Sequence, residues 1–236
     1  MRIDIYSIMW NEEKMLPYFL RHYSTFADKI FIINDHSTDK TLEIAKKNKK
    51  VTVLPFDYNR GIHEDDFNDC FQKYYKKFSR GKADWVACVD ADEFIYNKDV
   101  PGNLKRQRDA GVRIIRTTCF MMISKNFPKG KGQIYDEIKE GLRYRRFDKP
   151  VVFDPILDIE FTPGRHDIKP IADGVRPQKG KLALLHYRYL SKSYYLKRSL
   201  GKFARTPSKI QYKDYRIARG LKYYKDALNS NPPRVI

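Results

Sequence analysis

Three acidic residues directly follow an apolar run near residue 90. Residues 85–89 form the sequence WVACV, and Asp90, Asp92 and Glu93 come immediately after it. In an extended chain, Asp90 and Asp92 would share one face at a separation of roughly 7 Å. Two carboxylates at that spacing favour a hard divalent cation, Mg²⁺ or Mn²⁺, which keeps further positions for water and phosphate oxygens. A solvated acidic turn is the alternative that this spacing leaves open.

Two more polar clusters follow apolar runs upstream. The sequence NEE (residues 11–13) comes after IDIYSIMW, and NDHSTD (residues 34–39) comes after KIFII. In open α/β sheets, ligands bind beyond the carboxyl ends of the strands. If these runs are parallel strands, the three acidic clusters line one crevice.

The first 95 residues alternate strand and helix patterns, which predicts a parallel, doubly wound α/β sheet. Asn11 is expected to cap the first helix, and Ser37 or Thr38 the second. Less regular segments follow, with further strands and two basic helices. The expected strands are residues 2–10, 28–35, 50–56, 83–90, 112–123, 149–155 and 181–190, and the expected helices are residues 11–27, 36–48, 63–79, 193–203 and 214–229.

The chain is strongly basic, with 47 Lys and Arg against 29 Asp and Glu over 236 residues and a net charge of +18. Residues 187–236 hold 13 basic side chains and two acids. Such a balance favours a polyanionic neighbour. We expect one mixed-charge domain over residues 1–195 and a basic helical C-terminal extension over residues 196–236.

Composition narrows the class of protein. A hydrophobic content of 42% argues against wholesale disorder. No apolar run approaches the roughly 20 residues that span a bilayer, and the start lacks a signal-peptide layout. The three cysteines, Cys70, Cys88 and Cys119, are widely spaced and odd in number. This favours buried thiols in a reducing compartment over a disulfide framework or a zinc site. We expect a cytoplasmic protein.

Three ordered motifs make the chain recognisable. SIMWNEEKMLPYFLRHY, DKIFIINDHSTDKT and WVACVDADEFI, with the later LLHYRYLS, resemble the family 2-like glycosyltransferases of the GT-A fold. The likeness is to a branch with polysaccharide-building enzymes of bacteria and large DNA viruses. It implies a mostly parallel central sheet flanked by helices. It also implies transfer of a sugar, with inversion, from a nucleotide-diphosphate sugar to an acceptor hydroxyl, with a UDP-sugar favoured.

The resemblance also implies roles for residues at the strand ends. A helix cap remains the alternative role for Asp35, and a buried histidine bonded to backbone for His186. Arg60 would meet phosphate or base, or stand on a surface loop. The residues assigned to the donor are Met9, Asn11, Glu12, Asp35, Ser37, Arg60 and Asp90, and those assigned to Mn²⁺ or Mg²⁺ are Asp90, Asp92 and His186.

The catalytic base is harder to place because the family's usual Glu-Asp pair is not present in that order. An inverting transfer needs one carboxylate near the acceptor hydroxyl. Asp136 is the first candidate, Asp167 is the alternative, and Asp154, Asp158 and Glu160 are further ones. For each of them a surface salt bridge is the other possibility.

The basic extension admits three interpretations. It can lie on an anionic membrane that carries a lipid-linked acceptor, bind nucleic acid, or pack its aromatic residues on the body. Nucleic acid is the weakest of these partners, because the acidic crevice would repel phosphates unless a metal fills it. A nucleotidyltransferase that makes sugar nucleotides is the rival enzyme, but no glycine-rich phosphate loop follows the first strand.

Overall fold

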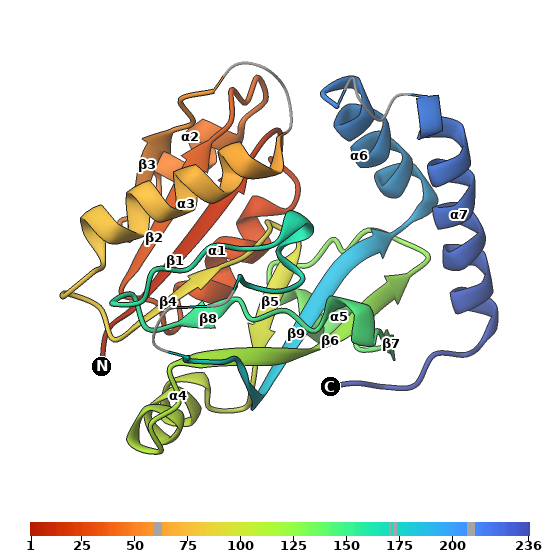
Figure 1. Ribbon diagram of the computed structural model, residues 1–236. Coiled ribbons are helices and arrows are strands. Elements are labelled where there is room, and N and C mark those ends of the chain that lie inside the picture. The colour runs from red at the N-terminus through yellow and green to blue at the C-terminus, as the bar shows by residue number, and fades with distance from the viewer. Residues whose placement is uncertain (59–62, 170, 172–173, 207–210) are drawn as a thin grey trace.

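The computed structural model describes residues 1–58, 63–169, 171, 174–206 and 211–236. Nine strands of these residues form one sheet in the order β3-β2-β1-β4-β8-β6-β9-β5, with β7 paired to β6. Helices flank the sheet. The two C-terminal helices, α6 and α7, lie side by side beyond one end of β6 and β9 (Figure 1). Arg60, a predicted donor contact, lies outside the described residues.

The N-terminal half is the parallel α/β layer that the alternation predicted. Strand β1 pairs in parallel with β2 and β4, and β2 with β3. Neighbouring residues of β1 point to opposite faces: Ile5 belongs to the cluster that contains α1, and Tyr6 to the cluster that contains α3. The elements are β1 (Ile3–Met9), α1 (Leu16–Tyr23), β2 (Lys29–Asn34), α2 (Thr41–Lys46), β3 (Val51–Pro55), α3 (Glu64–Phe78) and β4 (Trp85–Cys88).

The C-terminal half of the sheet is mixed. Strand β8 joins β4 to β6 with antiparallel pairing on both sides. Strand β9 runs parallel to β6 and antiparallel to β5. The elements are β5 (Glu93–Tyr96), α4 (Val100–Asp109), β6 (Ile114–Ser124), α5 (Ile134–Glu137), β7 (Gly141–Arg143), the 3₁₀ helix η1 (Arg145–Phe147), β8 (Val152–Phe153), the 3₁₀ helix η2 (Pro163–Arg165) and β9 (Gln178–Leu190).

The predicted helix caps were wrong. Helix α1 begins only at Leu16 and α2 at Thr41, neither with a side-chain cap. Asn11 instead takes a left-handed backbone conformation, with φ of 53°. Its Oδ1 accepts a hydrogen bond from Thr38 N at 2.7 Å, and its N donates to Ser37 Oγ at 3.1 Å. These polar residues tie the loop after β1 to the loop after β2.

Helices α6 (Lys192–Ala204) and α7 (Lys213–Asn229) pack on the far end of β6 and β9. The Tyr224 hydroxyl donates to Ser124 O at 2.7 Å. Gly220 allows the close approach of the helices, because an added Cβ would lie 1.7 Å from the Tyr195 hydroxyl. The boundary expected at residue 195 falls inside α6. None of the described helices is long and apolar enough to cross a membrane.

Candidate functional site

Four acids meet at the carboxyl ends of the parallel strands. Glu12 follows β1, Asp35 follows β2, and Asp90 and Asp92 follow β4. Because β2, β1 and β4 are neighbours running in the same direction, their ends meet at one edge of the sheet. We call these four residues the acidic rim. Cations from three later parts of the chain contact it.

Asp90 and Asp92 lie in a turn, closed by a hydrogen bond from Glu93 N to Asp90 O at 3.0 Å. They therefore do not stand on one extended face, and each meets different cations. Asp90 forms an ion pair with Arg165 and lies 3.8 Å from Lys149 Nζ. Burial alone would raise the pKa of Asp90, but the charges of Arg165 and Lys149 hold that pKa well below its ordinary value.

Asp92 is shared between a histidine and an arginine. Its Oδ2 lies 3.5 Å from His186 Nε2 and also accepts a hydrogen bond from Arg198. Arg198 reaches on to Glu12 Oε1 at 2.6 Å. Burial opposes ionisation of Asp92, but Arg198 and His186 keep its pKa well below the ordinary value. Glu12 differs: burial outweighs Arg198 and raises its pKa to about 7.

Arg205, the residue directly after α6, contacts the other end of the rim. This guanidinium donates to Asp35 Oδ2 at 2.5 Å and lies 4.6 Å from the centre of the Trp10 ring. Among the other predicted donor contacts, Met9 O accepts hydrogen bonds from Asp35 N at 2.9 Å and from Ser37 Oγ at 3.4 Å. The residues expected to hold base and ribose are therefore adjacent, and α6 lies over them.

Several contacts at this site were not predicted from the sequence. Lys149 and Glu93 form a fully buried ion pair at 2.6 Å, with side chains 2% and 0% exposed. Glu93 Oε1 also lies 4.0 Å from His186 Nδ1. Arg165, Arg198 and Arg205 were missed as well, because nothing local in their sequence marks an arginine that crosses to a distant acid. The only signal was general: a basic chain with an acidic crevice.

The donor atoms of Asp92 and His186 are of the kinds that Mn²⁺ and Mg²⁺ accept. Across the described residues, however, no group of three His, Cys, Asp or Glu side chains is arranged to hold a metal ion. Arg198 contacts the same Asp92 oxygen that faces His186. The residues therefore fit a divalent cation in their chemistry, and such a cation would take the place of the Arg198 guanidinium.

The two candidate bases lie in different places. Asp136 closes a capping box at the start of α5, where its Oδ2 accepts from Gln133 N at 2.8 Å. Asp167 follows η2 and pairs with Arg116 at 2.6 Å. It lies two residues from Arg165, the partner of Asp90. Asp167 is thus connected to the rim through η2, whereas Asp136 is used in holding a helix end.

A family model described as "Glycosyl transferase family 2" matches residues 4–159. A solved structure of a TarS fragment from S. aureus matches at 14% identity and a TM-score of 0.44, covering 87% of this chain and 65% of that one. The same fragment with UDP matches at 15% identity and a TM-score of 0.47, covering 87% of this chain and 65% of that one. The fragment with UDP-GlcNAc matches at 15% identity and a TM-score of 0.42, covering 80% of this chain and 57% of that one. The chain spans less than two thirds of these structures. No curated protein matches.

Proposed function

Because this chain belongs to glycosyl transferase family 2, we propose that it transfers a sugar, with inversion, from a nucleotide-diphosphate sugar to an acceptor hydroxyl during glycan or polysaccharide synthesis. The observation that carries the proposal is the acidic rim. Glu12, Asp35, Asp90 and Asp92 converge at one edge of a GT-A-like sheet, and His186 joins them from β9. A uridine donor is favoured, since uridine is the commoner base with such metal sites.

Met9, Asn11, Asp35 and Ser37 would hold the base and the ribose, and Asp90 would face the ribose and the cation. Asp92 and His186 would bind Mn²⁺ or Mg²⁺, which when present offsets the charge on the departing diphosphate. Arg198 would then leave Asp92 and be free to face phosphate oxygens, for which a guanidinium is well shaped. The low pKa of Asp92 keeps its carboxylate charged, as a cation ligand requires.

An acceptor hydroxyl must lose its proton as the new bond forms. We place Asp167 ahead of Asp136 as the base, since η2 connects Asp167 to Arg165 and hence to Asp90. Asp136 remains the second candidate. Comparing Asp167→Asn with Asp136→Asn separates them: the base variant should lose transfer while keeping donor binding. If both variants transfer at the wild-type rate, neither is the base.

The first test is a thermal-shift screen of UDP-, GDP- and dTDP-sugars with and without Mn²⁺, because a ligand of the native state raises stability. UDP-GlcNAc, which one similar structure holds, is the first donor to try. Release of nucleoside diphosphate in the same samples reports catalysis. Family membership already favours a glycosyltransferase over the nucleotidyltransferase and the nucleic-acid binder. A chain that no sugar nucleotide stabilises, with or without metal, would overturn the proposal.

A lipid-linked acceptor would bring the protein to the inner face of a membrane. Helix α7 fits this role, since Arg216, Arg219, Lys222 and Lys225 are exposed while Ile217 and Tyr224 pack inward. Each basic side chain near an anionic membrane contributes about 1 kcal/mol. Replacing these four by Gln should abolish co-sedimentation with anionic vesicles at low salt and leave donor hydrolysis unchanged. Binding that persists in 1 M salt would contradict an electrostatic contact.

A further inference from the structure

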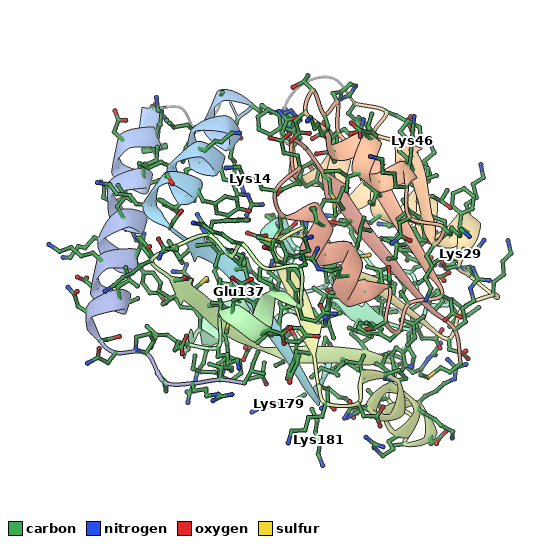
Figure 2. The ribbon with its side chains drawn as sticks, turned by 180° about the vertical axis from the view of Figure 1, so that it is seen from behind. Lys14, Lys29, Lys46, Glu137, Lys179 and Lys181 are labelled. Carbon is green, nitrogen blue, oxygen red and sulfur yellow. The ribbon has the colours of Figure 1, made fainter. Side chains whose placement is uncertain are left out.

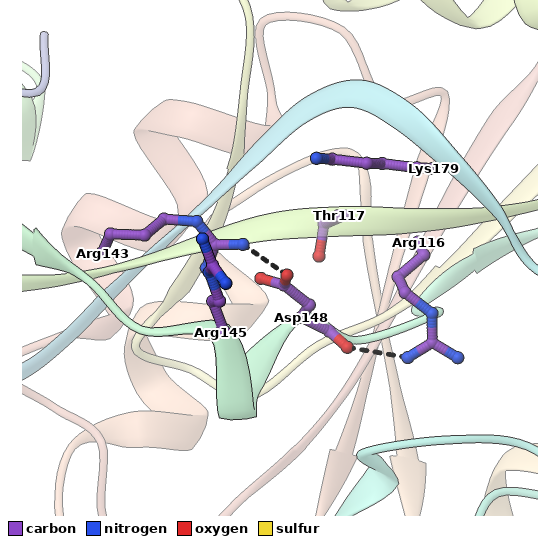
Figure 3. A pocket seen from close by; sticks show the side chains of 6 residues that line it. All are labelled: Arg116, Thr117, Arg143, Arg145, Asp148 and Lys179. Carbon is purple, nitrogen blue, oxygen red and sulfur yellow. Dashed lines mark hydrogen bonds and ion pairs between the residues drawn. The ribbon is translucent and has the colours of Figure 1, made fainter.

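A cavity of about 470 Å³ lies beside the acidic rim and is lined by Arg116, Thr117, Arg143, Arg145, Asp148 and Lys179 (Figure 3). These residues come from β6, β7, η1, the segment after η1, and the start of β9. A volume of this size is within the range of small-molecule sites, about 300–1,000 Å³. Four cations and one carboxylate line it. We call it the basic cavity.

Asp148 does not neutralise the basic cavity. Its carboxylate accepts hydrogen bonds from Arg143 and, at 2.8 Å, from Cys119 N. Arg143 also donates to Cys119 O at 3.0 Å, so this pair is held against β6. Arg116 is held too, by Asp167 at 2.6 Å and by Asp148 O at 2.9 Å. Figure 3 shows Asp148 between Arg143 and Arg116, with dashed lines to both.

The remaining two cations have no such partner. Within the described part of the chain, the side chains of Arg145 and Lys179 form no ion pair or hydrogen bond, and both are exposed. Like charges that line one cavity repel each other, and a bound anion removes that repulsion. A guanidinium donates two parallel hydrogen bonds to phosphate or carboxylate, and an ammonium adds a point charge.

Two segments connect the basic cavity to the acidic rim. Phe147 stands between Arg145 and Asp148 in sequence, and its ring centre lies 5.4 Å from that of His186. Lys149 directly follows the lining residue Asp148, and it pairs with Glu93 and faces Asp90. The second is the segment after η2, where the lining residue Arg116 contacts Asp167 and His166 O. A molecule in the cavity would therefore meet Arg116, the partner of the candidate base Asp167.

We propose that the basic cavity binds a phosphate or carboxylate group carried by the acceptor, so that the enzyme glycosylates an anionic glycan or polymer unit. This inference rests on the proposed transferase function. The diphosphate of the donor is the alternative anion that the basic cavity could bind. That diphosphate is expected at the rim, whose acids lie at the ends of β1, β2 and β4 and meet four cations: Lys149 before β8, Arg165 of η2, Arg198 of α6 and Arg205 directly after α6. The basic cavity lies instead along β6 and β9.

The test compares two double variants that each remove two positive charges. Arg145→Ala with Lys179→Ala changes the basic cavity, and Lys29→Ala with Lys46→Ala changes β2 and α2. Lys29 and Lys46 are exposed and lie across the molecule from Lys179 (Figure 2). Inorganic phosphate and acetate are titrated into the full chain by calorimetry, with and without saturating UDP. All four side chains are exposed, so melting temperatures should not change.

We expect about tenfold weaker phosphate binding in the cavity variant and no change in the control, as the loss of a charged hydrogen bond predicts. If the acceptor carries a carboxylate, acetate should likewise bind more weakly to the cavity variant than to the control. Transfer to an anionic acceptor should fall about tenfold, while transfer to a neutral acceptor and donor hydrolysis stay unchanged.

Equal weakening in both variants would overturn the proposal, because binding would then follow the overall charge. Competition between phosphate and UDP would also overturn it, since the cavity would belong to the donor. A wild-type chain that binds no phosphate overturns it as well. Failure of the transferase proposal shows separately, as an absence of donor hydrolysis in every variant while the phosphate titration still reports on the cavity.

Discussion

The acidic rim and the basic cavity are neighbours that handle charge in opposite ways. At the rim, Glu12, Asp35, Asp90 and Asp92 each have a cationic partner within the chain. In the cavity, Arg145 and Lys179 have none among the described residues. A ligand at the rim must therefore displace an existing ion pair, whereas a ligand of the cavity meets charges that are already available.

This difference bears on the order of binding. A buried ion pair that loses one partner leaves an uncompensated charge at a cost of about 3–5 kcal/mol. In the proposed function, a donor with its cation would replace both partners at once, since the cation would meet Asp92 and the diphosphate would meet Arg198. Neither the cation alone nor the diphosphate alone would replace both partners of the ion pair. The rim should therefore favour the two together, while the cavity should bind its anion independently.

The largest expected effect comes from removing the charge of Asp92. Asp92→Asn keeps the shape of the side chain but weakens its hold on a cation and on Arg198. We expect transfer to fall by about 10²–10³-fold, the usual cost of losing a charged group that stabilises the transition state. Steady-state transfer with saturating Mn²⁺ measures this. Asp109→Asn is the control, because Asp109 is an exposed partner of Lys105 on α4. An Asp92→Asn enzyme with wild-type rates would remove the rim from the mechanism.

A change at Arg198 tests whether the rim is really held closed by its own cation. Arg198→Met frees Asp92 Oδ2 and removes a positive charge near the expected metal position. Mn²⁺ affinity without nucleotide should rise about tenfold. Lys197→Met, at an exposed neighbouring position of α6, should leave it unchanged. Titration calorimetry decides; equal or weaker Mn²⁺ binding by Arg198→Met means that the arginine does not compete with the ion.

Much of the rim was predictable from the sequence, because each acid follows an apolar strand and the chain alternates strand and helix. The cations were not, since pairs such as Arg205 with Asp35 join residues 170 positions apart. Strand β5 and helix α4 were missed because α4 buries only Val100, Asn103 and Leu104 and gives little periodicity. The basic cavity was invisible for a similar reason: β6 and β9 bring Arg116 and Lys179 into register only in the folded sheet.

The smallest expected effect is a pH dependence of stability at the rim. The pKa of Glu12 is raised by burial to about 7 from 4.5, so the native state holds a proton between these values. The contribution of Glu12 to stability therefore falls as pH rises from about 4.5 to about 7. His22 acts in the opposite direction, because burial lowers its pKa to about 4 and its contribution is lost as pH falls below 6.5.

Comparing Glu12→Gln with the wild type isolates the Glu12 term, since His22 is common to both. Between pH 6 and pH 7 the variant should gain about 1 kcal/mol relative to the wild type, the value of most of one pKa unit. Urea unfolding at several pH values measures the difference. Parallel pH profiles would show that Glu12 is already ionised by Arg198, as fully as Asp92 is. The rim would then hold its charge at every pH in this range, and a ligand would still have to displace Arg198 to reach Glu12, unlike an anion that enters the basic cavity.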